Sequence, residues 1–135
     1  MRMISGSFNG TGSAINLGLG IAPDFVRVVN TAERIQVEWN RHMLDGADAC
    51  KGGVKTVADG TRTILTAGNG IEPYAGAETA GSSNTDKLVY DPDNDDYTFA
   101  AADEGVELPQ GFTLNDTDVC ADGDVCVFEA GFYDN

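Results

Sequence analysis

The stretch Phe25-Val-Arg-Val-Val-Asn30, followed shortly by Ile35-Gln-Val-Glu-Trp-Asn40, decides the fold that the sequence predicts. In both segments apolar and polar residues alternate, which is the pattern of a β-strand with one buried face. The polar segment Asn30-Thr-Ala-Glu33 is short enough to join them as an antiparallel β-hairpin. The pairing places Trp39 in the core, together with the other apolar residues of its strand.

Short alternating segments separated by turn residues predict the remaining strands. The clearest turn contains Asp59-Gly60, because glycine accepts the positive φ angle that a tight turn requires. Residues 41–53 are the one stretch whose pattern allows a helical turn, and Gly52-Gly53 would end it. The further segments predicted to form strands or hairpins are 14–17, 54–66, 87–90 with 97–100, 112–114 and 124–130.

Length and composition predict a single all-β domain over residues 1–135. The chain has 17 glycines, 4 prolines and only short apolar runs, which is typical of turn-rich β-structure. We therefore expect an antiparallel β-sandwich or a jelly-roll-like barrel with long Gly/Ser-rich and acidic loops. Residues 67–86 are small and polar, so they are predicted to form a long surface loop. Residues 1–9 are predicted to form an N-terminal arm or an edge strand.

The charge of −14 is concentrated in one part of the chain. Residues 1–85 hold eight acidic and seven basic residues, whereas residues 86–135 hold fourteen acidic residues and one lysine. Such a surface disfavours binding to nucleic acid or to an anionic membrane. Three interpretations stay open: solubility, a cation site, or an acidic face that meets a basic partner. The absence of a long apolar run and of an apolar signal sequence predicts synthesis in a cytosol.

Two parts of the chain contain ordered short motifs. The first is Ser7-Phe-Asn-Gly-Thr-Gly-Ser-Ala-Ile-Asn-Leu-Gly18 with Pro23-Asp-Phe-Val-Arg-Val-Val-Asn30, and the second is Gly111-Phe-Thr-Leu114 with Gly123-Asp-Val-Cys-Val-Phe-Glu-Ala130. Together these parts, within roughly the first 40 and the last 25 residues, resemble the small β-rich virion proteins of tailed bacteriophages. The resemblance implies a structural component of the virion, such as a capsid decoration protein or a fibre domain, and it implies no catalytic residues.

From this resemblance we expect a capsid decoration (cement) protein that binds the major capsid protein on the outside of the shell and stabilises it. The protein would be made in the bacterial cytoplasm and located in the virion, as a homo-oligomer. A trimer is favoured because threefold points recur on icosahedral shells. The residues expected to contact a neighbour belong to the N-terminal arm, whose removal would leave the fold intact: Arg2, Met3, Ile4 and Phe8.

The alternative function is a tail-fibre, spike or head-fibre domain that binds a glycan on the host surface. Exposed aromatic rings stack on sugars, and Tyr74, Tyr90 and Tyr97 lie in or beside predicted loops. The sequence leaves both functions open.

Two acidic clusters are candidates for calcium binding. Asp91, Asp93 and Asp95 have the first three spacings of a calcium loop, but Asp96 stands where that loop needs glycine, and Ala102 stands where it needs glutamate. An ordinary solvated turn is the competing interpretation, and we expect no cofactor. The second cluster consists of Asn115, Asp116, Asp118, Asp122 and Asp124.

The residues of nucleophilic catalysis do not form a recognisable motif, so we expect no enzyme. His42 is the only histidine, and no Gly-x-Ser-x-Gly motif accompanies it. Zinc binding by His42 with Cys50, Cys120 and Cys126 lacks the Cys-x-x-Cys spacing of known sites. Thiols are expected in a reducing cytosol, and a disulfide between Cys120 and Cys126 is the alternative.

Overall fold

The computed structural model describes residues 2–76, 86–99 and 107–133, and this part of the chain is all-β. The two short 3-10 helices confirm the predicted helical turn in residues 41–53. The elements are β1 (Arg2–Asn9), β2 (Ile15–Gly18), β3 (Phe25–Asn30), β4 (Ile35–Asn40), η1 (Arg41–Asp45), η2 (Asp48–Cys50), β5 (Gly53–Thr56), β6 (Arg62–Leu65), β7 (Ile71–Tyr74), β8 (Asp86–Asp91), β9 (Asp96–Phe99), β10 (Gly111–Leu114) and β11 (Val125–Phe132).

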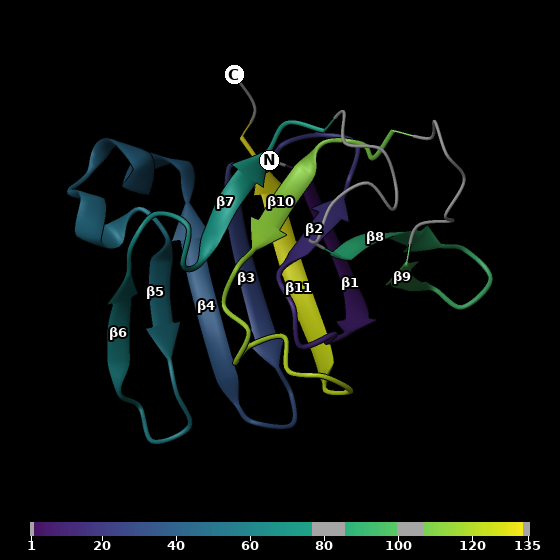
Figure 1. Ribbon diagram of the computed structural model, residues 1–135. Helices are drawn as coiled ribbons and strands as arrows, with labels where there is room; N and C mark the ends of the chain where they lie inside the picture. Colours follow the sequence, from purple (N-terminus) through teal and green to yellow (C-terminus); the bar gives the residue numbers. More distant parts are fainter. Residues whose placement is uncertain (1, 77–85, 100–106, 134–135) are drawn as a thin grey trace.

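All the described strands belong to one curled sheet with the order β6-β5-β4-β3-β11-β1-β9-β8-β2-β10-β7. Neighbouring strands are antiparallel except for β1 with β9 and β2 with β8, which are parallel. The sheet curls until β7, at one end, contacts β4 near the other end, and the amide of Ile71 donates to the Gly52 carbonyl at 2.9 Å. In Figure 1, β7, β10 and β2 consequently lie in front of β4, β3 and β11. The fold is therefore a sandwich-like half-barrel formed by one mixed sheet.

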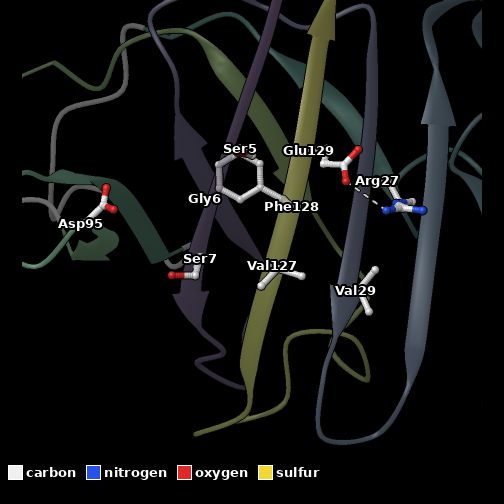
Figure 2. A pocket seen from close by; sticks show the side chains of 9 residues that line it. All are labelled: Ser5, Gly6, Ser7, Arg27, Val29, Asp95, Val127, Phe128 and Glu129. Atoms are coloured by element: carbon white, nitrogen blue, oxygen red, sulfur yellow. Dashed lines mark hydrogen bonds and ion pairs between the residues drawn. The ribbon is translucent and has the colours of Figure 1, made fainter.

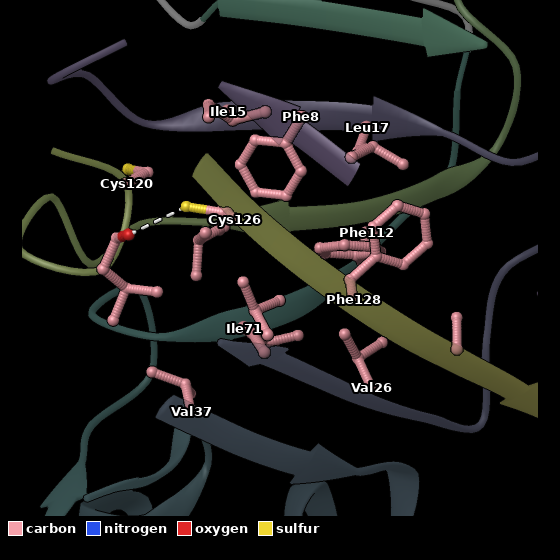
Figure 3. Packing of buried hydrophobic residues seen from close by; sticks show 14 of the residues in the cluster. Phe8, Ile15, Leu17, Val26, Val37, Ile71, Phe112, Cys120, Cys126 and Phe128 are labelled. Carbon is pink, nitrogen blue, oxygen red and sulfur yellow. Dashed lines mark hydrogen bonds between the residues drawn. The ribbon is translucent and has the colours of Figure 1, made fainter. Parts of the chain in front are cut away.

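The core lies between the two layers of the curled sheet (Figure 3). The rings of Phe112 in β10 and Phe128 in β11 meet edge to face, with centroids 5.7 Å apart, and so join the layers. Trp39 is buried as predicted, and its indole N–H donates to the Lys51 carbonyl at 3.1 Å. Burying an aromatic side chain of this size stabilises the fold by about 3 kcal/mol.

The predicted hairpin of residues 25–40 is confirmed. Its strands pair with Val28 opposite Val37 and Val26 opposite Trp39, and these four side chains are buried. The connection is held by Asn30, whose side chain is fully buried. Its Oδ1 accepts the amides of residues 32 and 33, and its Nδ2 donates to the Val119 carbonyl and to Asp124 Oδ2, both at 3.0 Å. Asn30 therefore links the hairpin to the segment before β11.

The prediction of an N-terminal arm or edge strand is wrong. Strand β1 lies inside the sheet and pairs with β11 along its whole length, from Arg2 opposite Phe132 to Asn9 opposite Val125. The first described strand of the chain is thus paired with the last. The local sequence pattern of residues 1–9 did not reveal this pairing, because β1 and β11 are far apart in sequence. Deleting residues 1–8 would remove most of β1, so it would disrupt the sheet.

The prediction of one surface loop over residues 67–86 is also wrong in part. Ile71 is buried, and strand β7 pairs with β10, opposite Gly111 to Leu114. Residues 77–85 lie outside the described part. The predicted hairpins β5–β6 and β8–β9 are present, whereas the last two strands do not pair with each other: β10 pairs with β2 and β7, and β11 pairs with β1 and β3.

A largely buried ion-pair cluster joins β5 to the segment between β10 and β11. The Lys55 ammonium lies 3.0 Å from Asp116 Oδ2 and 3.0 Å from Asp118 Oδ2, and the side chains of Lys55 and Asp116 are 12% and 9% exposed. Burial lowers the pKa of Lys55, but the hydrogen bonds and charges of the two aspartates raise it by more in total, so its pKa lies above the ordinary value.

We expect Lys55→Met to lower the free energy of unfolding by about 2 kcal/mol at pH 7, because it leaves Asp116 buried without its cation. Because the folded-state pKa of Lys55 is raised, its contribution is complete below the unfolded pKa of about 10.4 and is lost as the pH rises through the folded pKa. The difference between wild type and variant in urea unfolding should therefore shrink above about pH 10.4.

Lys51→Met is the matched control, because Lys51 pairs with the exposed Asp48 across one turn and such pairs contribute about 0.5 kcal/mol or less. An equal loss of stability in both variants, or a difference that stays constant up to about pH 12, would contradict the role given to Lys55.

Candidate functional site

A broad surface in the described part is the face of β1, β11, β3, β4, β5 and β6 that points away from the core, here called the outer face. Residues directly opposite each other in antiparallel strands point to the same side, so the register defines its rows. The central row is Ser5, Glu129, Arg27, Glu38, Val54 and Ile64. The second row is Ser7, Val127, Val29, Gln36, Thr56 and Arg62.

An ion pair lies in the middle of the outer face. Arg27 Nη2 donates to Glu129 Oε1 at 3.0 Å, and both side chains are nearly half exposed. Glu38 lies opposite Arg27 on the other side, so the arginine stands between two glutamates. Figure 2 shows Glu129 and Arg27 joined above the pair Val127 and Val29. Because the pair is exposed, its contribution to stability is small, about 0.5 kcal/mol.

Two open hollows lie on either side of this ion pair, and Arg27 and Glu129 line both. One hollow, of about 390 Å³, is formed over the small residues Ser5 to Ser7 and is bordered by Asp95 (Figure 2). The other, of about 380 Å³, is lined by the aromatic residues Phe25, Trp39 and Tyr133 among others. Such hollows have room for the side chains of a partner.

The outer face also exposes large apolar side chains. Met3 is 51% exposed, Val125 48%, Val127 40% and Ile64 59%. Single exposed apolar residues such as Met3 and Ile64 need no explanation, but Val125 and Val127 are neighbours on one face of β11 and form an apolar group of the kind found at interaction surfaces. This surface is the strongest candidate functional site in the described part of the chain.

The four residues predicted to contact a neighbour do not share one location. Arg2 stacks over the Phe132 ring at 5.8 Å, Ile4 packs against the core, and Phe8 is buried at 2% exposure. Phe8 is therefore a core residue, and its prediction as an interface residue is wrong. Met3 is the one of the four whose side chain belongs to the outer face.

The three tyrosines predicted to bind a glycan do not form one site. Tyr97 is 7% exposed and its ring lies edge to face against Phe128, so it is a core residue, and burial raises the pKa of its hydroxyl. Tyr90 is half exposed and donates to Asp95 at 2.8 Å. Tyr74 lies in β7, and strands β2 and β10 separate β7 from the strand of Tyr90. The prediction that these three tyrosines bind a glycan together is therefore wrong.

The acidic clusters use their carboxylates in hydrogen bonds within the protein. Asp91 accepts the amide of Asp93 and the side chain of Asn94 in the β8–β9 turn. Asp116 is bound to Lys55 and Asp124 to Asn30, so the second predicted cluster contributes to the fold. Within residues 2–76, 86–99 and 107–133, no three histidine, cysteine or acidic side chains are placed to share a metal ion.

The three cysteines are free thiols. Cys120 and Cys126 are fully buried, and burial raises the pKa of Cys120 to about 12 and that of Cys126 to about 11. His42 stacks on Tyr133 with ring centroids 6.2 Å apart. The zinc site of His42 with the cysteines is accordingly not assembled among the described residues.

The sequence patterns did not identify Arg27, Glu38 and Glu129 as site residues. The alternation in β3 and β4 already places Arg27 and Glu38 on the solvent side. The position of Glu129 beside Arg27 depends on the pairing of β11 with β3, which no local pattern reveals.

No family model, no curated protein and no solved structure matches the chain. No helix in the described residues is long and apolar enough to span a membrane.

Proposed function

We propose that this chain is a capsid decoration protein of a tailed bacteriophage, which binds the major capsid protein on the outside of the shell and stabilises it. Its role is structural and not catalytic, and it acts as a homo-oligomer. Several weak contacts made at the same time would hold it on the shell, because each bound contact raises the effective concentration of the next.

One observation carries the proposal: the two segments that resemble phage virion proteins lie together in the fold. Residues 7–30 contribute to β1, β2 and β3, and residues 111–130 contribute to β10 and β11. They pair as β3-β11-β1 in one layer and as β2-β10 in the other, and Phe112 and Phe128 join the layers across the core. The two segments that carry the resemblance are distant in sequence, but their strands pair with one another in the fold.

The exposed apolar residues of the outer face support a protein-binding role. Its mixture of apolar, aromatic and arginine side chains is the composition found in protein interfaces. The glycan-binding alternative has less support, since the three tyrosines chosen for it are separated and Tyr97 is buried.

The test is co-sedimentation of the purified protein with capsids of its phage that were prepared without it. We expect saturable retention at a fixed ratio to the major capsid protein. Capsids that already carry the protein are the control and should retain no more. Absence of saturable retention would contradict the decoration role and would favour the fibre-domain alternative, which binding to host cells would test next.

A further inference from the structure

We propose that the outer face binds the outer face of a second copy of this chain, so that two copies pair about a twofold axis with their sheets packed face to face. The inference goes beyond the decoration role and does not depend on it, because it rests only on the charge, size and side chains of this surface. It gives the assembly two copies, whereas the symmetry of an icosahedral shell favoured three.

The charge of the outer face differs from that of the whole protein. The chain carries −14, but the strand residues of the outer face include two arginines, Arg27 and Arg62, and two glutamates, Glu38 and Glu129. Most acidic residues lie outside these six strands, and Asp95, in the β8–β9 turn, borders one hollow of the outer face. Two such acidic molecules repel each other, and the repulsion is least where neutral surfaces meet. The outer face is therefore a surface through which two copies can approach.

The central ion pair is complementary to a rotated copy of itself. Glu129 and Arg27 lie side by side on neighbouring strands β11 and β3 (Figure 2). A twofold axis that runs parallel to these two strands, midway between them and in the plane of contact, places Arg27 of each copy opposite Glu129 of the other. In a twofold contact each interaction occurs twice, so two new ion pairs form beside the two existing ones. Charge complementarity thus selects a second copy as the occupant.

The size of the outer face fits a weak and reversible dimer. An axis between β11 and β3 brings the four strands β4, β3, β11 and β1 of the two copies together. Spaced about 4.8 Å apart and each presenting about 20 Å of length, they cover about 400 Å² per copy. A stable interface buries about 800 Å² per partner, so the expected dimer forms at high protein concentration and dissociates on dilution. The apolar part of the contact comes from Val125 and Val127, which are 48% and 40% exposed in the single chain.

The first test is Val127→Lys, measured by sedimentation equilibrium at about 0.15 M salt, where long-range repulsion is screened beyond about 8 Å. The wild type is expected to dimerise reversibly. The variant should raise the dissociation constant at least about tenfold, because the dimer loses the apolar side chain in both copies. Tyr90→Lys is the matched control, since Tyr90 is similarly exposed, lies on β8 outside the outer face, and undergoes the same change of charge.

The second test uses opposite charges. Arg27→Glu leaves three acidic side chains in a row at the centre of the outer face, because position 27 lies between Glu38 and Glu129, and Glu129→Arg leaves two adjacent arginines there. Each variant alone should therefore stay monomeric. Mixed in equal amounts, the two variants should form a heterodimer, since both charges of one copy then meet their opposites across the axis. Circular dichroism of each variant confirms that it is folded, which is expected because the original pair is exposed.

Four results would overturn the proposal: a wild type that stays monomeric, an equal weakening of association in Val127→Lys and Tyr90→Lys, a mixture of the charge variants that stays monomeric, and an assembly of three copies. A failure of capsid binding would leave the proposal intact, because every one of these measurements uses the purified protein alone.

Discussion

Replacing Asn30 with leucine is expected to lower the free energy of unfolding by about 3 kcal/mol, because leucine keeps the volume of the side chain and removes its hydrogen bonds. The Val119 carbonyl would keep only the weak donor Cys126 Sγ, at 3.2 Å, and the Asp124 carboxylate would lose the Asn30 donor in a partly buried place. Loss of the stronger of two donors to a buried carbonyl costs about 1 kcal/mol, and loss of a donor to a charged acceptor costs about 2 kcal/mol. The amides of residues 32 and 33 belong to an exposed turn and would find water.

Urea unfolding followed by tryptophan fluorescence measures this effect, since Trp39 is buried in the neighbouring strand. Asn69→Ala is the control, because the Asn69 side chain binds Thr66 in an exposed turn, and its loss should change stability by less than about 0.5 kcal/mol. A stability of Asn30→Leu equal to that of wild type would show that Asn30 does not hold the hairpin against the β10–β11 segment.

Replacing Gly111 with alanine is expected to destabilise the protein by about 3 kcal/mol, the upper range for overpacking. A Cβ atom on Gly111 would overlap with the backbone carbonyl of Leu17 in the adjacent strand β2, where no side chain can rotate away. Strand β10 would have to move. This movement would disturb its pairing with β7 and the packing of Phe112 and Leu114, which are both fully buried.

Gly46→Ala is the matched control for this substitution. Gly46 has a φ of −86°, which alanine adopts readily, and a Cβ atom there would be at ordinary contact distance from its neighbours. We expect its unfolding free energy to stay within about 0.5 kcal/mol of wild type. Thermal unfolding of both variants is the measurement, and equal stability of Gly46→Ala and Gly111→Ala would contradict the close approach of β2 and β10.

The strands were predictable from sequence where the pattern is local. Alternation identifies the buried face of β4, with Val37 and Trp39, and Asp59-Gly60 identifies the turn between β5 and β6. The order of strands was not predictable, since β11 inserts between β1 and β3 through residues that are distant in sequence. Period-two patterns state which residues share a face and say nothing about which strand lies next to it.

The candidate site was less predictable than the fold, for a related reason. Tyr97 and Phe99 share one face of β9, yet their exposures are 7% and 63%, because Phe128 covers Tyr97 and not Phe99. Acidic residues pose a similar difficulty: Asp116 and Asp124 have the spacing of possible ligands, but their partners are Lys55 and Asn30. Only the three-dimensional structure distinguishes a carboxylate that accepts hydrogen bonds within the protein from one that is available to bind a ligand.

The position of β11 also has a consequence for the order of events during synthesis. Strands β1 and β3 leave the ribosome early, but both pair with β11, whose last residue is Phe132. Until that residue emerges, the nascent chain holds two strands with open edges that can pair with another chain. Formation of this sheet therefore waits for β11, and pairings between such distant residues form slowly. Where many ribosomes translate one messenger RNA at close spacing, the open edges of β1 and β3 in neighbouring nascent chains lie near one another and can pair. Slower initiation of translation spaces the ribosomes further apart and should therefore increase the yield of soluble protein.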